Sequence, residues 1–321
     1  MLKYDRILMD VSNMYYRAFC TSQNLTAEVD GEVMVTGGIY TVLKMFFRIR
    51  DTYLKEGGRI YYLFDNATSS DTRRKEIDPC YKANRKKQDP VFYRGLDYLY
   101  LVLQVLNTGD RLIRRPGSEA DDLAQPVIAS FKDKPYDILL ISNDLDWSRL
   151  IKDNAHWMIR DSATKKDLIF TKETFKEKYG FEPSLESVCL YKAIRGDASD
   201  NIPVGVKGLK EETVLDIIQQ AGSVENLFIR LKSLNLSDKW KKDFLDNRER
   251  VLLNYQLVSF QNLSISETRD FTEVTSFNKE ALGLLYRTLK FNPAKLDKRF
   301  IQDEKPVKTE DFFGAEQLPR A

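Results

Sequence analysis

Short apolar runs alternate along the chain with longer segments in which apolar residues recur every three or four positions. Three runs rich in branched and aromatic residues predict buried strands: 6–9, 60–64 and 138–141. Three segments have helical spacing: 36–51 after the first run, and 95–107 and 119–131 after the second. This alternation predicts an α/β fold with a central, mainly parallel sheet flanked by helices on both faces.

An acidic residue follows each predicted strand. Asp10 ends the first run, Asp65 follows the second, and Asp144 comes three residues after the third, with Asp146 close behind. One such acid is ordinarily a turn or helix-capping residue. Because the carboxyl ends of parallel strands meet at one edge of a sheet, three of them in register predict a functional site there.

Two further segments add carboxylates. In GSEADD, residues 117–122, Ser118 and Asp121 have the spacing of a capping box, but three negative charges in one turn repel one another unless a cation compensates them. In RGDASDN, residues 195–201, Asp197 and Asp200 are three apart and share a face, although a segment of this kind can also be a surface loop. The candidate metal ligands are Asp10, Asp65, Glu119, Asp121, Asp122, Asp144, Asp146, Asp197 and Asp200.

The ligand type favours hard cations. No histidine or cysteine accompanies these acids, and an all-oxygen set selects Mg²⁺ or Mn²⁺ over zinc. Nine carboxylates are too many for one ion. Two ions about 3.5–4 Å apart can clamp the attacking and leaving oxygens of an in-line displacement at phosphorus. The set therefore predicts phosphodiester hydrolysis.

A basic segment begins one residue after Asp65. Residues 66–94 carry eight arginines and lysines against four acids. A basic loop is commonly a solvated surface. Here it must leave the sheet at the acidic edge, where it can hold phosphates and stack bases on Tyr81 or Tyr93. A nucleic-acid backbone fits both the acids and this segment.

Composition narrows the class of protein without identifying a substrate. A chain of 321 residues can form one large or two modest domains. The three cysteines form no close pair, which favours a reducing, intracellular setting, and no apolar segment reaches membrane-spanning length. We expect a soluble, cytoplasmic protein with no membrane partner. The net charge of +2 is small, so the placement of charge matters more than its sum.

The motifs together resemble the 5′ nuclease family. LMDVSNMYYRAF, LFDNATSSDTRRKEIDPCYKANRKK, GSEADDL, SNDLDWSRL and RGDASDNIPVGVKG occur in the family's order and spacing, over about residues 5–215. The chain is similar to free-standing phage flap endonucleases and to the 5′ nuclease domain of bacterial DNA polymerase I. The resemblance implies a PIN-like core, a helical arch and a helix-hairpin-helix.

The same resemblance implies a function and its residues. It implies a structure-specific, divalent-metal-dependent 5′→3′ exonuclease and flap endonuclease acting on branched or primer-containing DNA in replication, with ribonuclease H activity on RNA–DNA hybrids, in a bacterial or phage-infected cell. Ligands of the first of two Mg²⁺ or Mn²⁺ ions are Asp10, Asp65, Glu119 and Asp121, and those around the second are Asp144, Asp146, Asp197 and Asp200, with Asp122 in an outer shell. Lys82 and Arg85, with Asp144 and Asp146, carry catalysis. The nucleic-acid contacts are Tyr16, Arg73, Arg74, Tyr81, Lys82, Arg85, Lys86, Lys87, Gly205 and Gly208; for Tyr16 a core position is the alternative.

Two departures from the family pattern bear on function. In the hairpin segment, 202–214, Lys210 replaces a usual glycine, Glu212 replaces a usual lysine, and one residue is inserted after Pro203. We expect the hairpin to form but to bind duplex DNA or K⁺ weakly. Pro126 should kink or cut the helix that carries EADD.

The predicted organisation is a catalytic core over 1–180 with the arch segment 66–94, a helix-hairpin-helix and helical duplex-binding region over 181–300, and a disordered tail over 301–321. Phe312 and Phe313 in the tail could anchor a single-strand-binding protein or a sliding clamp. We expect a monomer. Two alternatives share the fold: a flap-binding protein that does not cut, and a PIN-like ribonuclease.

Overall fold

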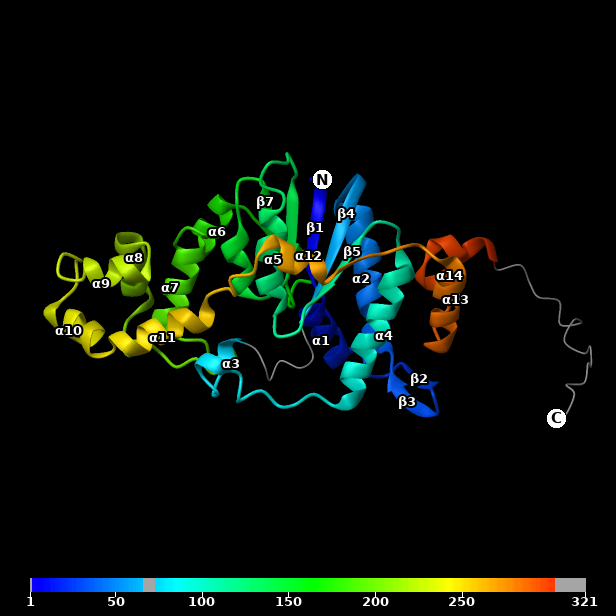
Figure 1. Ribbon diagram of the computed structural model, residues 1–321, viewed down its shortest axis with the longest axis horizontal. Coiled ribbons are helices and arrows are strands. Elements are labelled where there is room, and N and C mark those ends of the chain that lie inside the picture. Colours follow the sequence, from blue (N-terminus) through cyan, green and yellow to red (C-terminus); the bar gives the residue numbers. More distant parts are fainter. Residues whose placement is uncertain (1, 66–72, 304–321) are drawn as a thin grey trace, which may run out of the picture.

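The computed structural model describes residues 2–65 and 73–303 (Figure 1). Two parts of the predicted organisation therefore lie outside the described residues. They are the first seven residues of the basic segment, 66–72, and most of the predicted tail, with Phe312 and Phe313. Within the described ranges, no helix is both long and apolar enough to cross a membrane.

A seven-stranded sheet forms the centre of the molecule, in the order β8-β7-β6-β1-β4-β5-β9. The five inner strands are parallel, and the two edge strands, β8 and β9, are antiparallel to their neighbours. The strands are β1 (Tyr4–Asp10), β4 (Leu54–Phe64), β5 (Arg111–Arg114), β6 (Ile138–Ile141), β7 (Ala155–Arg160), β8 (Asp167–Phe170) and β9 (Thr272–Val274). The predicted parallel sheet is confirmed, with four strands beyond the three that apolar runs indicated.

Helices cover both faces of this sheet, as predicted. Alternate residues of β1 point to opposite sides: Ile7 and Met9 join one apolar cluster and Leu8 joins another. The first face is covered by α1 (Val11–Thr21), α2 (Gly37–Tyr53), α4 (Pro90–Leu106), α13 (Lys279–Thr288) and α14 (Pro293–Leu296). The second face is covered by α5 (Ala120–Ala129), the 3₁₀ helix η2 (Leu145–Leu150), α6 (Lys172–Tyr179), α7 (Leu185–Arg195) and α8 (Glu211–Ala221).

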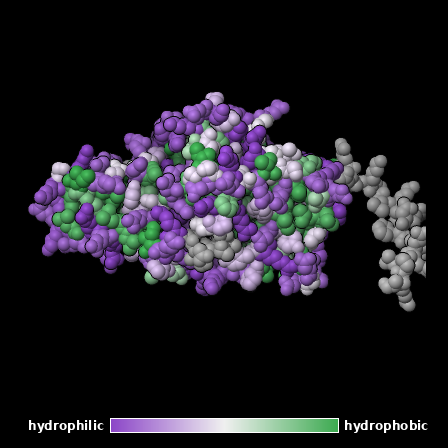
Figure 2. Space-filling model, viewed as in Figure 1, coloured by the Kyte–Doolittle hydropathy of each residue, from purple (hydrophilic) through white to green (hydrophobic). Residues whose placement is uncertain are grey.

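The remaining elements lie around this core. They are the hairpin β2 (Thr26–Val29) and β3 (Glu32–Val35), α3 (Arg73–Ile77), the 3₁₀ helix η3 (Ala198–Asp200), α9 (Val224–Ile229), α10 (Asp238–Asp246), α11 (Arg248–Val258), α12 (Ile265–Asp270) and η4 (Lys298–Asp303). Helices α8–α11 form one end of the elongated molecule (Figure 1). The face in Figure 2 is largely hydrophilic, with apolar residues gathered over the α8–α10 end.

The region 181–300 does not form one body in space. Its last part returns to the core, because β9 pairs with β5 and α13 packs against α4. Leu282 and Tyr286 of α13 are fully buried in the first apolar cluster. Residues 272–300 therefore pack on the core at the end opposite α8–α11 (Figure 1), and the duplex-binding role expected of 181–300 stays a prediction.

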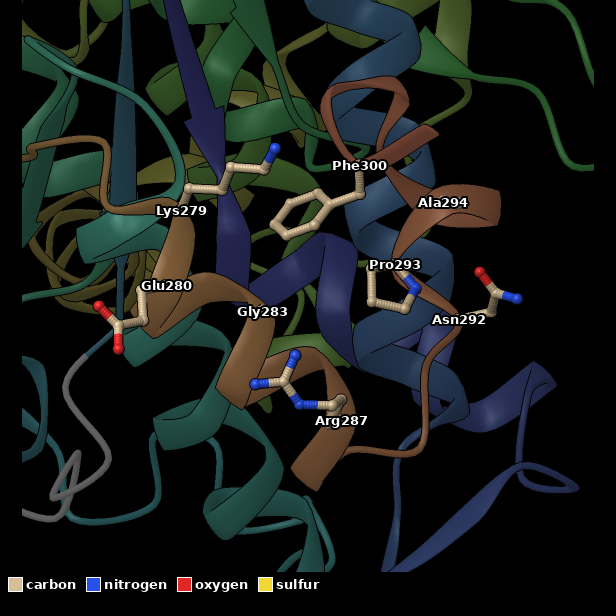
Figure 3. Close-up of a pocket in the computed structure, with 8 residues that line it drawn as sticks. All are labelled: Lys279, Glu280, Gly283, Arg287, Asn292, Pro293, Ala294 and Phe300. Atoms are coloured by element: carbon tan, nitrogen blue, oxygen red, sulfur yellow. The ribbon is translucent and has the colours of Figure 1, made fainter. Parts of the chain in front are cut away.

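A cavity of about 690 Å³ lies at this opposite end. It is bordered by α13, α14 and η4, with the Phe300 ring and the Arg287 side chain facing it (Figure 3). None of the predicted site residues lines it. The chemistry of the acids is therefore placed at the edge of the sheet and not in this cavity.

Pro126 does not cut its helix. α5 runs from Ala120 to Ala129 with Pro126 inside it. Because proline has no N–H, the last turn of the helix lacks one backbone hydrogen bond. The neighbouring residues Ala124, Val127 and Ile128 are buried in the second apolar cluster, which holds this turn in place. Tertiary packing thus maintains the helix through a residue that the sequence treats as a break.

Candidate active site

The acids at the strand ends meet at one edge of the sheet, as predicted. Asp10 is the last residue of β1 and caps α1, accepting from the Asn13 amide at 3.0 Å. Its other oxygen accepts from the Ser142 hydroxyl at 2.8 Å, just beyond β6. β1 lies between β4 and β6 and is hydrogen-bonded to both. Asp10 is therefore at the centre of three neighbouring strand ends.

Asp65 links this edge to the EADD turn. Its amide donates to the Ser12 hydroxyl at 2.8 Å, and one carboxylate oxygen accepts from the Ala120 amide at 2.8 Å. Ala120 is the first residue of α5, so the helix begins on the carboxylate that ends β4. Glu119 and Asp122 form a reciprocal capping box, in place of the predicted Ser118–Asp121 pairing.

The second acidic loop approaches from the other side. Asp144 caps η2, and Asp197 caps η3, where Asp200 is buried. Lys192 of α7, itself buried, ties the two loops together: its Nζ lies 2.5 Å from Asp146 and 2.9 Å from Asp197. Three of the four predicted ligands of the second set, Asp144, Asp146 and Asp197, therefore lie around a lysine.

The basic segment is docked on the acids and does not stand clear of them. The Lys82 ammonium lies 2.7 Å from Glu119, and the Arg85 guanidinium lies 2.5 Å from Asp200. The Lys82 amide also donates to the Asp200 carbonyl at 2.8 Å. Both predicted catalytic cations thus lie at the site, and α3 packs against α11 at its margin (Figure 1). Of the predicted helical arch, the described residues form only α3 and the start of α4.

Two assigned roles are wrong in this structure. Tyr81 is 2% exposed, and its hydroxyl donates to Asp200 at 3.0 Å, so its ring cannot stack on a base. Arg74, predicted to bind nucleic acid, is 3% exposed and pairs with both oxygens of Asp122 at 2.7 and 2.9 Å. Asp122 also accepts from the Gln261 amide, so its oxygens are engaged within the protein, and the outer-shell role expected of it stays a prediction.

The other predicted nucleic-acid contacts vary in accessibility. Tyr16 is 46% exposed, which rules out the core alternative. Lys86 and Lys87 are exposed. Arg73 is partly buried and donates to the carbonyls of Gln256 and Ser259, which ties α3 to the end of α11.

Charge is unevenly compensated across the first carboxylate group, which we define as Asp10, Asp65, Glu119 and Asp121. Burial and the charge of Asp65 raise the pKa of Asp10 to about 8. Burial and the charge of Glu119 also raise the pKa of Asp65. Burial favours a raised pKa for Glu119 too, but the charges of Lys82 and Arg74 outweigh it and lower that pKa to about 2.

The second carboxylate group, Asp144, Asp146, Asp197 and Asp200, shows the same division. Loss of hydration and the charge of Asp146 raise the pKa of Asp144. For Asp146, the charges of Arg149 and Lys192 outweigh burial and lower the pKa. Neither cation was predicted. The sequence did contain a sign of both. Arg149 lies between apolar residues in WSRL, and Lys192 lies between apolar residues in CLYKAI, and a charged side chain that is buried in this way needs a partner of opposite charge.

These donors fit divalent cations, although the site is not preassembled around one. In residues 2–65 and 73–303, no three carboxylate, histidine or cysteine groups converge closely enough to hold an ion. Over the same residues, no ion pair involves Asp10 or Asp65, which are held only by amide and hydroxyl donors. Asp10 is buried and Asp65 is partly buried, and two carboxylates that repel each other and offer only oxygen ligands match the preference of Mg²⁺ and Mn²⁺.

The hairpin forms between α7 and α8, as predicted. Gly208 has a φ of +84°, which favours glycine, and the Gly205 amide donates to the Ile194 carbonyl at 2.9 Å. Asn254, fully buried in α11, donates to the carbonyls of Ala193 and Pro203 and so holds the hairpin against α7. Sequence patterns did not indicate this asparagine.

Gly205→Ala should destabilise the hairpin more than Gly208→Ala. A Cβ at 205 would lie 2.3 Å from the Ala193 carbonyl oxygen, so the backbone must move, whereas a Cβ at 208 meets only the Trp240 ring at 3.5 Å. We expect urea denaturation to show a loss of about 1–3 kcal/mol at position 205. At position 208 we expect about 1 kcal/mol, from the left-handed backbone alone. The reverse order would contradict this account of the close approach.

Two family models match this chain in consecutive segments. The 5′-3′ exonuclease N-terminal resolvase-like domain matches residues 5–180, and the 5′-3′ exonuclease C-terminal SAM fold matches residues 184–280. Together they span the sheet, the acids and the hairpin. The hairpin and helices α8–α11 fall within the second match.

Curated proteins and solved structures agree with these matches. The chain is 30% identical over 251 residues to a 5′-3′ exonuclease of Buchnera aphidicola, which covers 75% of this chain and 80% of that protein. It is 28% identical over 292 residues to a DNA polymerase I of Caldicellulosiruptor bescii, covering 89% of this chain but 32% of the polymerase. A bacteriophage T5 D15 flap endonuclease, solved as a pseudo-enzyme–product complex with DNA and metal ions, shares the fold, with a TM-score of 0.59 and 20% identity over 89% of this chain and 97% of that one.

Proposed function

The chain belongs to the 5′-3′ exonuclease family, and from that membership we propose that it is a structure-specific 5′→3′ exonuclease and flap endonuclease that requires divalent metal. Its proposed substrates are branched or primer-containing DNA and RNA–DNA hybrids in replication. The observation that carries the proposal is the position of Asp10 and Asp65. They are two acids at adjacent strand ends, held without a cationic partner among the described residues, in a site on which Lys82 and Arg85 of the basic segment are docked.

Two metal positions are proposed, one for each carboxylate group. Asp10, Asp65 and Glu119 of the first group would hold one Mg²⁺ or Mn²⁺, and Asp144 and Asp146 of the second would begin the other. When bound, such ions neutralise phosphate charge and activate water for in-line attack. T5 D15, a protein with the same fold, has been solved with metal ions, and this supports the assignment.

Lys82 and Arg85 are proposed to stabilise the charge that develops at phosphorus. Both contact carboxylates of the two groups, and each keeps part of its side chain in solvent: 18% for Lys82 and 51% for Arg85. A cation already oriented at the reaction site needs little reorganisation in the transition state. The charges of the acids keep both side chains protonated, since they outweigh burial and raise the pKa of each.

Lys86→Ala/Lys87→Ala should weaken DNA binding without lowering stability. Both side chains are exposed beside the acids, where phosphate contacts add affinity but no packing. We expect the slope of log Kobs against log salt to fall by about 1–2, measured by fluorescence anisotropy on a flap substrate. Lys132→Ala/Lys134→Ala, at two exposed lysines just beyond the far end of α5, is the matched control and should leave the slope unchanged. Equal losses in both variants would mean that binding reflects overall charge.

The decisive experiment compares cleavage of a 5′-labelled double-flap DNA and a matching RNA-primed duplex, with Mg²⁺, with Mn²⁺ and with EDTA. We expect cutting near the junction in either metal and none in EDTA. Binding without cutting in both metals would identify a branch-recognition protein instead. Cleavage of RNA with DNA flaps left intact would identify a PIN-like ribonuclease.

K⁺ titration of duplex binding tests the hairpin separately, and strong K⁺ dependence would overturn the weak binding that Glu212 predicts.

A further inference from the structure

Arg149 occupies an unusual position between the two carboxylate groups. It lies in η2, and its side chain is fully buried. One guanidinium nitrogen, Nη2, lies 3.2 Å from Asp121 of the first group and 3.2 Å from Asp146 of the second. A single nitrogen therefore bridges carboxylates that come from two different helices, α5 and η2, and belong to different predicted metal positions.

The rest of the side chain is held firmly. Nε donates to the Asp146 carbonyl at 2.9 Å, and Nη1 donates to the Val258 carbonyl at the end of α11. The guanidinium plane lies 3.9 Å from the centre of the Phe260 ring. These backbone partners and the ring fix the position of the Arg149 guanidinium. We therefore expect it to keep this position when metal or DNA binds, unlike the guanidinium of the half-exposed Arg85.

The electrostatic reason for this arrangement follows from burial. Asp121 and Asp146 are 8% exposed, and two buried carboxylates close to one cation would repel each other if that cation were removed. Compensation by Arg149 is partial, because its single positive charge is shared between these two carboxylates. A divalent cation therefore still has charge to neutralise at this place.

We propose that Arg149 is a positioning residue that keeps the two carboxylate groups together when no divalent metal is bound, by supplying part of the positive charge that the metals supply when present. The inference rests on the proposed function, since it assumes that these groups bind metal. It predicts that the metal-free site of this protein stays assembled, and that metal stabilises a variant lacking Arg149 more than it stabilises the parent.

The test is thermal unfolding of the full chain in EDTA and in saturating Mn²⁺, for the parent, Arg149→Met and Arg149→Lys. Methionine keeps most of the length of the arginine side chain but carries no charge. Lysine keeps the positive charge but lacks the planar guanidinium group, whose several N–H donors contact several partners at once. In EDTA we expect Arg149→Met to unfold about 5–10 °C below the parent, because it removes a cation that contacts both buried carboxylates. In Mn²⁺ we expect more than half of that difference to be recovered, with Arg149→Lys intermediate.

Arg50→Met provides a matched control. Arg50 pairs with Asp110, a buried acid at the opposite end of the strands. This variant should also unfold at a lower temperature, but by the same amount in EDTA and in Mn²⁺. The difference between the two buffers, and not the loss of stability itself, therefore reports a role toward the metal sites.

Each outcome decides the proposal. If Arg149→Met folds only with Mn²⁺, the proposal is supported. If it folds in neither buffer, Arg149→Lys decides: a larger Mn²⁺ shift than in the parent supports the proposal, and an equal shift overturns it. Equal shifts for all variants, with the parent stabilised by Mn²⁺, would make Arg149 a packing residue only. A parent that shows neither a Mn²⁺ shift nor metal-dependent cleavage would instead refute the proposed function.

Discussion

Asp10→Asn should reduce kcat for flap cleavage by about 10³-fold or more while making the metal-free protein more stable. Asparagine can still accept from the Asn13 amide, and its amide can donate to the Ser142 hydroxyl, so the local hydrogen bonds survive. What is lost is a carboxyl whose pKa is raised to about 8 by burial and by the charge of Asp65, and which near neutral pH must therefore take up a proton when the metal-free protein folds. We expect a gain of about 1–2 kcal/mol in EDTA, because a site built to bind a cation is destabilised when the cation is absent.

Single-turnover cleavage and urea denaturation with and without Mg²⁺ measure the two effects. Asp5→Asn changes an acid at the other end of β1, where the carboxylate pairs with Lys55, and should leave kcat unchanged. In Mg²⁺ the gain in stability of Asp10→Asn should shrink or reverse, since the parent gains more from the metal. If kcat fell while the metal-free protein became less stable, Asp10 would be a capping residue of α1 and not a ligand.

Arg74→Met should cause the largest loss of stability among the charged residues of the basic segment. Arg74 is buried, donates twice to Asp122 and also donates to the carbonyls of Leu257 and Ser259. Breaking a buried ion pair by removing one partner leaves the other charge uncompensated and costs about 3–5 kcal/mol. Urea denaturation should show this loss, whereas DNA affinity measured on the folded variant should change little.

Arg73→Met is the neighbouring control, because Arg73 is more exposed and, within the described part of the chain, donates only to backbone carbonyls. Its expected loss is about 1 kcal/mol. In the double variant Arg74→Met/Asp122→Asn, part of the stability should return, because the uncompensated charge is gone. A stable Arg74→Met with a reduced salt dependence of DNA binding would restore the phosphate-contacting role that the sequence suggested.

The order of the acids along the chain was a sound guide to the site. Asp10, Asp65 and Asp144 each follow an apolar run, and parallel pairing of β6, β1 and β4 brings them to one edge. Lys82 and Arg85 were placed correctly as well, since both lie on the acids. Strand ends and loop motifs are formed by residues close together in the chain, so the pattern of apolar and acidic residues in the sequence can predict them.

Three of the cations that compensate the acids were not predicted to do so. Arg149 and Lys192 lie in apolar runs, and Arg74 lies in a segment whose other bases are partly or fully exposed. Their burial depends on α11 and α7 packing against the site, contacts that join residues more than 40 positions apart in the chain. Polarity alone assigned all the bases of residues 66–94 to solvent or to phosphate.

The sequence by itself determined the sheet, because apolar runs of strand length followed by helical spacing admit few other arrangements, and it determined which acids gather at its edge. Only the tertiary structure decided how those acids are shared between protein and metal. Asp122 is taken by Arg74, Asp146 is held by Arg149 and Lys192, and Asp10 and Asp65 are left without a cationic partner among the described residues. The physical reason is that the energy of a buried charge depends on its distance to other charges, and folding sets those distances.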